Sequence, residues 1–178
     1  MAGMSAIIET PLRLPPELAP EMARFVATMP YAPRAFLIDE VLEVDAARAR
    51  VRARLDTTKE LPLVADQRGD PATHPRHLAA PVMIQLTGML GMVHAYFLHG
   101  VRFDEGWIGF GSRIHRADFK RLVRLGAPLE LESIETKARL GPDRHIVRYE
   151  FRFTQDGALC YFGDQTATWL RGRSFPDE

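Results

Sequence analysis

Histidines are the side chains in this sequence best suited to moving protons, because an imidazole titrates near neutral pH. His74 and His77 flank Pro75 in a polar stretch, and His94 and His99 lie in the apolar run that follows. His74 lies shortly before that run, which makes it a candidate for catalysis. It could equally be an ordinary loop histidine, and His77 is the other candidate for the catalytic role. His94 is a candidate acid or a satisfied interior histidine. His99 suits a helix end, where the helix dipole favours positive charge.

Two uncharged polar side chains interrupt the apolar run. Gln85 could face a substrate or a dimer seam. Thr87 could line a binding tunnel or hold a water, or it could pack within a helix and bond back to a carbonyl one turn earlier. The neighbouring Gly88 and Gly91 each cost a helix roughly 1 kcal/mol relative to Ala, so they need a packing or access reason. The close approach of a ligand or a second backbone would supply one.

A dense basic stretch lies downstream. It is either an ordinary solvated surface, or a docking site for a phosphate group or for the acidic surface of a partner protein. Arg offers bidentate contacts to phosphate. Its members are Arg113, Arg116, Lys120, Arg121 and Arg124.

Several kinds of chemistry have no motif here. The histidines are scattered and no His-Glu-x-x-His spacing occurs, so we predict no metal site. The segment "IGFGSR" contains Gly-x-Gly but lacks the third glycine of a nucleotide fingerprint, and no serine nucleophile elbow occurs, so we predict no cofactor. Cys160 is the single cysteine, which excludes an internal disulfide and suits a reducing compartment, so we expect a cytoplasmic protein.

The elements that must position these residues follow from hydrophobic periodicity. The run from about Pro81 to His99 is apolar on nearly every side, which predicts a buried helix. The segment 35–56 reads as two strands. In the second, arginines that face water alternate with apolar residues. Four strand-like segments follow the helix, at 107–115, 129–138, 145–153 and 158–170. This order predicts an α+β domain in which an antiparallel sheet packs against one helix.

The length of 178 residues fits one domain. We predict an N-terminal extension with a short helix (1–33), the main domain (34–172) and a tail (173–178). The long segment 56–80 predicts a functional or mobile loop. Zero formal net charge gives no case for a nucleic-acid or anionic membrane partner. We also expect no membrane-spanning segment or signal peptide.

Three blocks of sequence are similar to a known family. "MPYAPRAFLIDEVLEVD", "THPRHLAAPVMIQLTGMLG" and "IGFGSRIHRADFKRLVRLGAPLELE" occur in the order and approximate spacing of the bacterial 3-hydroxyacyl-acyl-carrier-protein dehydratases. The resemblance covers roughly Met29 to Trp169. It implies the hot-dog fold, in which an antiparallel sheet wraps around one long central helix.

The resemblance also implies roles for individual residues. His74 takes the position of the family's base, and a backbone amide near the helix start would hold the thioester oxygen. Thr87 takes the position of a carboxylic acid that protonates the leaving hydroxyl, a role that a threonine cannot fill. No Asp or Glu occurs between Pro81 and His99, and Val82 replaces the family's usual glycine.

These features predict dehydration of a 3-hydroxyacyl thioester in fatty-acid or polyketide-type metabolism, with His74 as base and acid and Thr87 or Gln85 positioning a water. The alternatives are an acyl thioesterase, or a non-catalytic subunit paired with an active partner that brings the missing carboxylate. The expected partners are an acyl-carrier-protein or coenzyme A thioester and a second hot-dog subunit, identical or related. The expected substrate-binding residues are Pro81, Val82, Gly88, Gly91, Arg116, Lys120 and Arg121.

Overall fold

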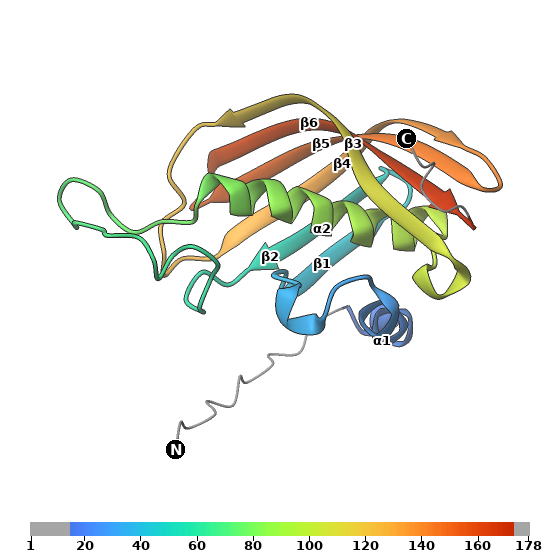
Figure 1. Ribbon diagram of the computed structural model, residues 1–178, viewed down its shortest axis with the longest axis horizontal. Helices are drawn as coiled ribbons and strands as arrows, with labels where there is room; N and C mark the ends of the chain where they lie inside the picture. Colours follow the sequence, from blue (N-terminus) through green and yellow to red (C-terminus); the bar gives the residue numbers. More distant parts are fainter. Residues whose placement is uncertain (1–14, 173–178) are drawn as a thin grey trace, which may run out of the picture.

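A single long helix lies against one antiparallel sheet at the centre of the molecule (Figure 1). The computed structural model describes residues 15–172. Helix α2 (Ala80–His99) begins with Pro81 in its first turn and ends at Gly100, whose φ of 65° is the left-handed conformation that glycine adopts readily. The predicted central helix is therefore confirmed to within one residue.

By length and composition α2 could cross a membrane, whereas no segment of this kind was expected from the sequence. In this fold, however, 67% of its most apolar 18-residue window is buried. A helix that is apolar all round is typical of a protein core as well as of a membrane span.

The sheet has six strands in the order β1-β2-β4-β5-β6-β3, all paired antiparallel. Two strands precede α2 and four follow it, as the sequence predicted. Strand β3 runs four residues past the predicted end at His115, because its second half is exposed and leaves no burial pattern to read. The strands are β1 (Glu40–Asp45), β2 (Arg50–Leu55), β3 (Trp107–Phe119), β4 (Leu129–Leu140), β5 (Arg144–Gln155) and β6 (Ala158–Arg171).

Alternation along the strands separates the core from the outer face. In β2, Val51, Ala53 and Leu55 are buried against the helix. The intervening arginines point outward, but they are only half-exposed, because they pair with acids on neighbouring strands. Arg54 lies 2.9 Å from a carboxylate oxygen of Glu40 on β1.

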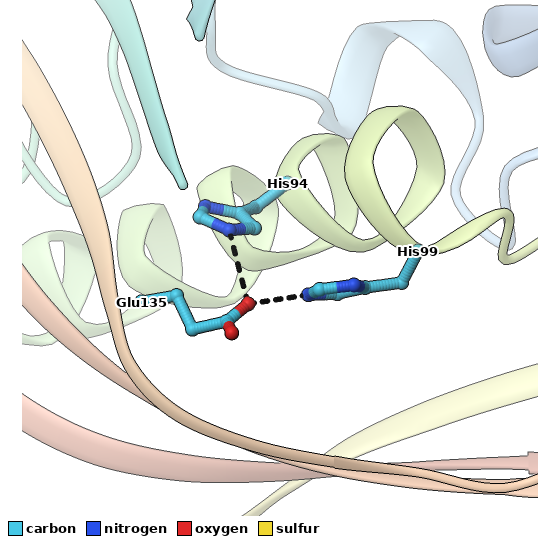
Figure 2. Close-up of side chains that lie close together, drawn as sticks. All are labelled: His94, His99 and Glu135. Carbon is cyan, nitrogen blue, oxygen red and sulfur yellow. Dashed lines mark ion pairs between the residues drawn. The ribbon is translucent and has the colours of Figure 1, made fainter. Parts of the chain in front are cut away.

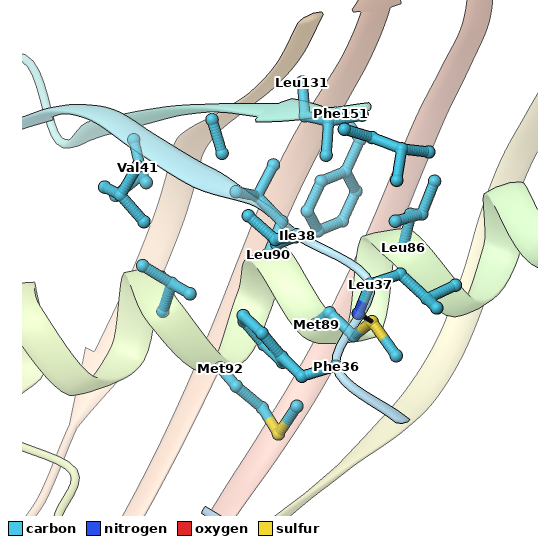
Figure 3. Packing of buried hydrophobic residues seen from close by; sticks show 14 of the residues in the cluster. Phe36, Leu37, Ile38, Val41, Leu86, Met89, Leu90, Met92, Leu131 and Phe151 are labelled. Carbon is cyan, nitrogen blue, oxygen red and sulfur yellow. Dashed lines mark hydrogen bonds between the residues drawn. The ribbon is translucent and has the colours of Figure 1, made fainter. Parts of the chain in front are cut away.

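The core forms where the segment before β1 meets α2 (Figure 3). Phe36, Leu37 and Ile38 pack on the helix, and the backbone N–H of Leu37 donates to the sulfur of Met89 at 3.3 Å. Three short 3₁₀ helices complete the connections: η1 (Pro16–Leu18), η2 (Pro33–Ala35) and η3 (Phe103–Glu105).

Helix α1 (Ala19–Thr28) lies within the segment predicted as an N-terminal extension. Its Phe25 is fully buried and meets the rings of Phe36 at 5.5 Å and Tyr96 at 5.2 Å, so α1 belongs to the same core. The first 14 residues of that extension and the predicted tail 173–178 lie outside the described residues.

The two edges of the sheet differ in character. Strand β1 forms one edge and carries the acids Glu40, Glu43 and Asp45. Strand β3 forms the other edge, and its 13 residues pair on one side only, with β6. Ile114 and Phe119 on β3 are 52% and 46% exposed. The β3 edge is therefore long and open, and it exposes apolar side chains among charged ones such as Arg113 and Arg116.

Candidate functional site

A cavity of about 300 Å³ lies between α2 and strands β3, β5 and β6. Most of its wall is apolar, from residues such as Met89, Met92, Phe151 and Trp169. Within the described part of the chain, no Asp, Glu, Lys, Arg or His lines it. The polar side chains in the wall are Tyr31, Gln85, Thr87, Tyr149, Gln165 and Thr166.

A short hydrogen-bonded chain joins α2 to β6 in this wall. The Thr87 hydroxyl lies 2.7 Å from the Ile84 carbonyl and 3.0 Å from the Gln165 side-chain oxygen. The Gln165 amide nitrogen donates to the hydroxyl of Tyr161 at 2.9 Å. Burial raises the pKa of Tyr161, so this hydroxyl stays protonated near neutral pH. Thr87 thus makes the backbone contact considered in the sequence analysis and also holds a polar partner.

Gln165 was not foreseen as a site residue. The signal was present, since Tyr161, Gly163, Gln165, Ala167 and Trp169 form one alternating row on β6 and only Gln165 has a long polar side chain there. A polar residue in an inward-facing row needs a partner, and here that partner is Thr87.

The two helix glycines leave room at the cavity. A Cβ added at Gly88 would meet no atom within 4 Å, and one at Gly91 would meet only the ring of Phe151, at 4.0 Å. Packing within the chain therefore does not require glycine at position 88. The remaining reason for a glycine there is the access of a ligand to the cavity. Gln85, one turn before Gly88 and Met89, is exposed at the same opening.

His74 does not reach this cavity within one chain. It lies exposed in the loop between β2 and α2, which projects beyond the sheet at the N-terminal end of the helix (Figure 1). Its backbone pairs with Asp70, and its ring lies 5.4 Å from that of His77.

Pro81 and Val82 also lie away from the cavity wall. Pro81 is exposed and Val82 is buried. The backbone N–H of Val82 already donates to the carbonyl of Ala79 at 3.0 Å. The Val82 amide is therefore already used within this chain. It is not free to donate to a thioester oxygen, which is the role that the resemblance implies for an amide near the helix start.

The basic residues gather around the end of β3, outside the cavity. Arg116 and Lys120 both bind the Asp118 carboxylate, at 2.6 and 2.9 Å, and these bonds lower the pKa of Asp118 to about 2. Arg124 pairs with Asp156. Arg113 and Arg121 form no salt bridge with any residue of the range 15–172.

A second polar cluster lies between the end of α2 and β4 (Figure 2). His99 Nε2 is 2.6 Å from a Glu135 carboxylate oxygen, and His94 Nε2 is 3.8 Å from the same atom. The Nδ1 atom of His94 is 2.9 Å from the Ser133 hydroxyl oxygen. Burial, and secondarily the nearby His99, lowers the pKa of His94 to about 3, so its imidazole is neutral.

This cluster was not foreseen, because Glu135 is far from the two histidines along the chain. Ser133 and Glu135 continue the inward-facing row of β4 that begins with Leu129 and Leu131. An acid in such a row is the signal that could have indicated a buried partner.

Comparisons with known proteins bear on the fold. No family model matches the sequence, and a search of curated proteins found no match. Among solved structures, a mutant thioesterase from Pseudomonas aeruginosa superposes with a TM-score of 0.56 at 16% identity, covering 88% of this chain and 95% of that one. A thioesterase from Haemophilus influenzae gives 0.51 at 17% identity, covering 85% and 90%.

A mutant thioesterase from Staphylococcus aureus gives a TM-score of 0.52 at 12% identity, covering 77% of this chain and 96% of that one. Identities this low establish shared architecture and leave the reaction open. The sheet order, the central helix and these superpositions together show that the chain adopts the hot-dog fold.

Proposed function

We propose that this protein binds acyl thioesters in the cavity beside α2 and hydrolyses them. The observation that carries the proposal is the make-up of the cavity wall, which is apolar except for a few side chains such as Thr87, Gln165 and Gln85. A concave apolar site with a few placed polar groups is typical of small-molecule binding. The thioesterases of the same fold support the choice of ligand.

The polar groups in the cavity suit hydrolysis better than dehydration. Dehydration needs a base for the proton next to the thioester carbonyl and an acid for the departing hydroxide, and the wall offers neither. In hydrolysis, water adds to the carbonyl carbon, the C–S bond breaks, and an acid and a thiol are released. A thiol of pKa about 8.5 leaves as its anion without prior protonation. Thr87 and Gln165 would hold the attacking water, and the proton that this water loses passes to the departing thiolate, which gives the thiol.

Turnover by this route is expected to be slow. A general base typically contributes about 10²- to 10⁴-fold, and the described cavity supplies none from its own chain. His74 remains a predicted base that would have to reach the cavity of a second subunit.

We also propose that two copies associate through β3. Gly109, Phe110 and Gly111 of this strand wall the cavity. The outer side of the strand is the open edge of the sheet, where Ile114 and Phe119 are exposed. Exposed strand edges are templates for pairing. A second copy on this edge would form the outer wall of the cavity. A related hot-dog subunit in the same place is the alternative outcome of the experiment.

The basic residues are our proposed contact for the phosphate groups of the thioester carrier. Arg113 and Arg121 are the better candidates, because Arg116 and Lys120 already share Asp118. Salt should weaken this contact, since exposed charges are screened.

The function is tested by incubating the purified protein with acyl and 3-hydroxyacyl thioesters of coenzyme A and of acyl carrier protein. Thiol release is followed with a chromogenic thiol reagent and products by mass spectrometry. We expect free acid and thiol. Loss of water from the 3-hydroxyacyl substrates, abolished by His74→Ala, would instead establish the dehydratase. Saturable binding without either product would indicate a non-catalytic subunit.

A matched pair of variants tests the site. Gly88→Ala and Gly88→Leu both enter open space and should fold, gaining up to about 1 kcal/mol of helix stability. Gly88→Leu should raise the KM for long acyl chains at least tenfold by filling the cavity, whereas Gly88→Ala should change it little. Equal kinetics for Gly88→Leu and wild type would show that the acyl chain binds elsewhere.

A further inference from the structure

Three potential metal ligands converge between the C-terminal end of α2 and strand β4 (Figure 2). They are the Nε2 atoms of His94 and His99 and a carboxylate oxygen of Glu135, and all lie within 4.8 Å of one another. Around one Zn²⁺ with bonds of about 2.0–2.2 Å, tetrahedral ligand atoms are about 3.4 Å apart. Small side-chain rotations would lengthen the 2.6 Å approach of His99 and shorten the 3.8 Å approach of His94.

The facing atoms are buried and incompletely paired. His99 Nε2 and Glu135 Oε2 meet as an ion pair at 2.6 Å, whereas His94 Nε2 has no hydrogen-bond partner among the described residues. The side chains of His94 and His99 are 0% and 8% exposed. Buried polar atoms are nearly always satisfied, because leaving them unpaired costs free energy. One cation between them would satisfy all three.

The surroundings orient the first histidine toward this point. The Ser133 hydroxyl holds Nδ1 of His94 at 2.9 Å, which leaves Nε2 directed at Glu135. Metal-binding histidines usually have their second ring nitrogen held in this way. Glu135 reaches the site because it pairs with Tyr149 just before an irregularity in β4, between Glu135 and Lys137.

We propose that His94, His99 and Glu135 form a Zn²⁺ site. Two imidazoles and one carboxylate are a donor set that Zn²⁺ accepts, with a fourth position left for water. The ion would join the end of α2 to β4. It would also stabilise the cavity wall, because the ring of Tyr149 lies 4.9 Å from that of His94 and lines the cavity.

The test uses the full-length protein stripped with a chelator and then titrated with ZnCl₂. Equilibrium dialysis with elemental analysis should give one zinc per chain, and Tm should rise with zinc concentration, since a ligand of the native state stabilises it. Co²⁺ should give visible absorption bands of a tetrahedral site, which ZnCl₂ abolishes. Failure of the wild-type protein to bind either ion stoichiometrically would overturn the proposal.

Variants separate this site from adventitious binding at the surface. Glu135→Gln should lose stoichiometric binding, whereas His74→Asn combined with His77→Asn removes the exposed histidine pair and should keep it. The opposite pattern would assign the zinc to the loop. If Glu135→Gln does not fold, Ser133→Ala, which leaves all three ligands in place, should weaken zinc binding about 10- to 100-fold. Unchanged zinc affinity in Ser133→Ala would count against the proposal. None of these measurements depends on thioester turnover.

Discussion

Thr87 and Gln165 hold one another across the wall of the cavity, so neither can be altered without affecting the other. Thr87→Val keeps the side-chain shape and removes the hydroxyl, which leaves the partly buried Gln165 oxygen without this partner. We expect kcat for thioester hydrolysis to fall about tenfold or more with little change in KM, because the acyl chain contacts stay in place. Steady-state kinetics on one acyl-coenzyme A substrate measures both constants.

Thr87→Ser is the matched control, since it retains the hydroxyl. It should keep kcat within a few-fold of wild type. A Thr87→Val enzyme as fast as Thr87→Ser would remove this hydroxyl from the proposed mechanism.

Cys160 is a second residue whose behaviour follows from its surroundings. It is 2% exposed, and burial raises the pKa of its thiol. Because the thiolate is the reactive form, the native protein should react with iodoacetamide much more slowly than the denatured protein at the same pH. Intact mass over time measures the labelled fraction. Equal rates in the two states would contradict the burial of this side chain.

Some residues predicted on the helix lie at the cavity, but their partners on other elements were not predicted. Gln85, Thr87, Gly88 and Gly91 do line the cavity. Gln165 could not be placed because its contact with Thr87 depends on how β6 lies against α2, which the sequence does not contain. His74 was assigned by resemblance, and no contact within one chain tests that assignment.

Among the elements, α2 contributes most to the core. Leu90 is fully buried beneath the sheet, and Leu140, at the end of β4, is 53% exposed. Leu90→Ala should lower the free energy of unfolding by about 2–5 kcal/mol, because it removes apolar contacts and leaves a cavity. Leu140→Ala should change it by less than about 0.5 kcal/mol. Urea unfolding followed by circular dichroism measures both, and similar losses would contradict this division of core from surface.

The helices and strands were more predictable than the sites, because their buried faces produce a regular spacing of apolar residues in the sequence. The helix is apolar on all sides, and β5 alternates Val147, Tyr149, Phe151 and Phe153 with polar residues. Strand β3 was predicted to end too early. Its residues beyond His115 are nearly all exposed, so they show no alternation of buried and exposed positions. A strand that is exposed along most of its length carries little of this regular spacing.

For the whole molecule, the proposed self-association gives a direct prediction. Ile114→Lys places a charge in the middle of the open β3 edge, where Ile114 is 52% exposed. It should shift the mass measured by light scattering from that of a dimer to that of one chain. Leu140→Lys, at a site of similar exposure away from this edge, should leave the mass unchanged. A wild-type protein that is monomeric at all concentrations would refute pairing through β3.

The unequal edges of the sheet also limit how far such association can proceed. Pairing of β3 with β3 of a second copy by two-fold symmetry consumes both open edges. The outermost strands of the assembly are then the two β1 strands, whose Glu40 and Glu43 are already held by Arg54 and Arg50. Pairing of a further strand with β1 is unfavourable, because the charged side chains of β1 already form ion pairs within the sheet. If two copies pair through β3 as proposed, the assembly should therefore stop at a dimer rather than extend into a fibre.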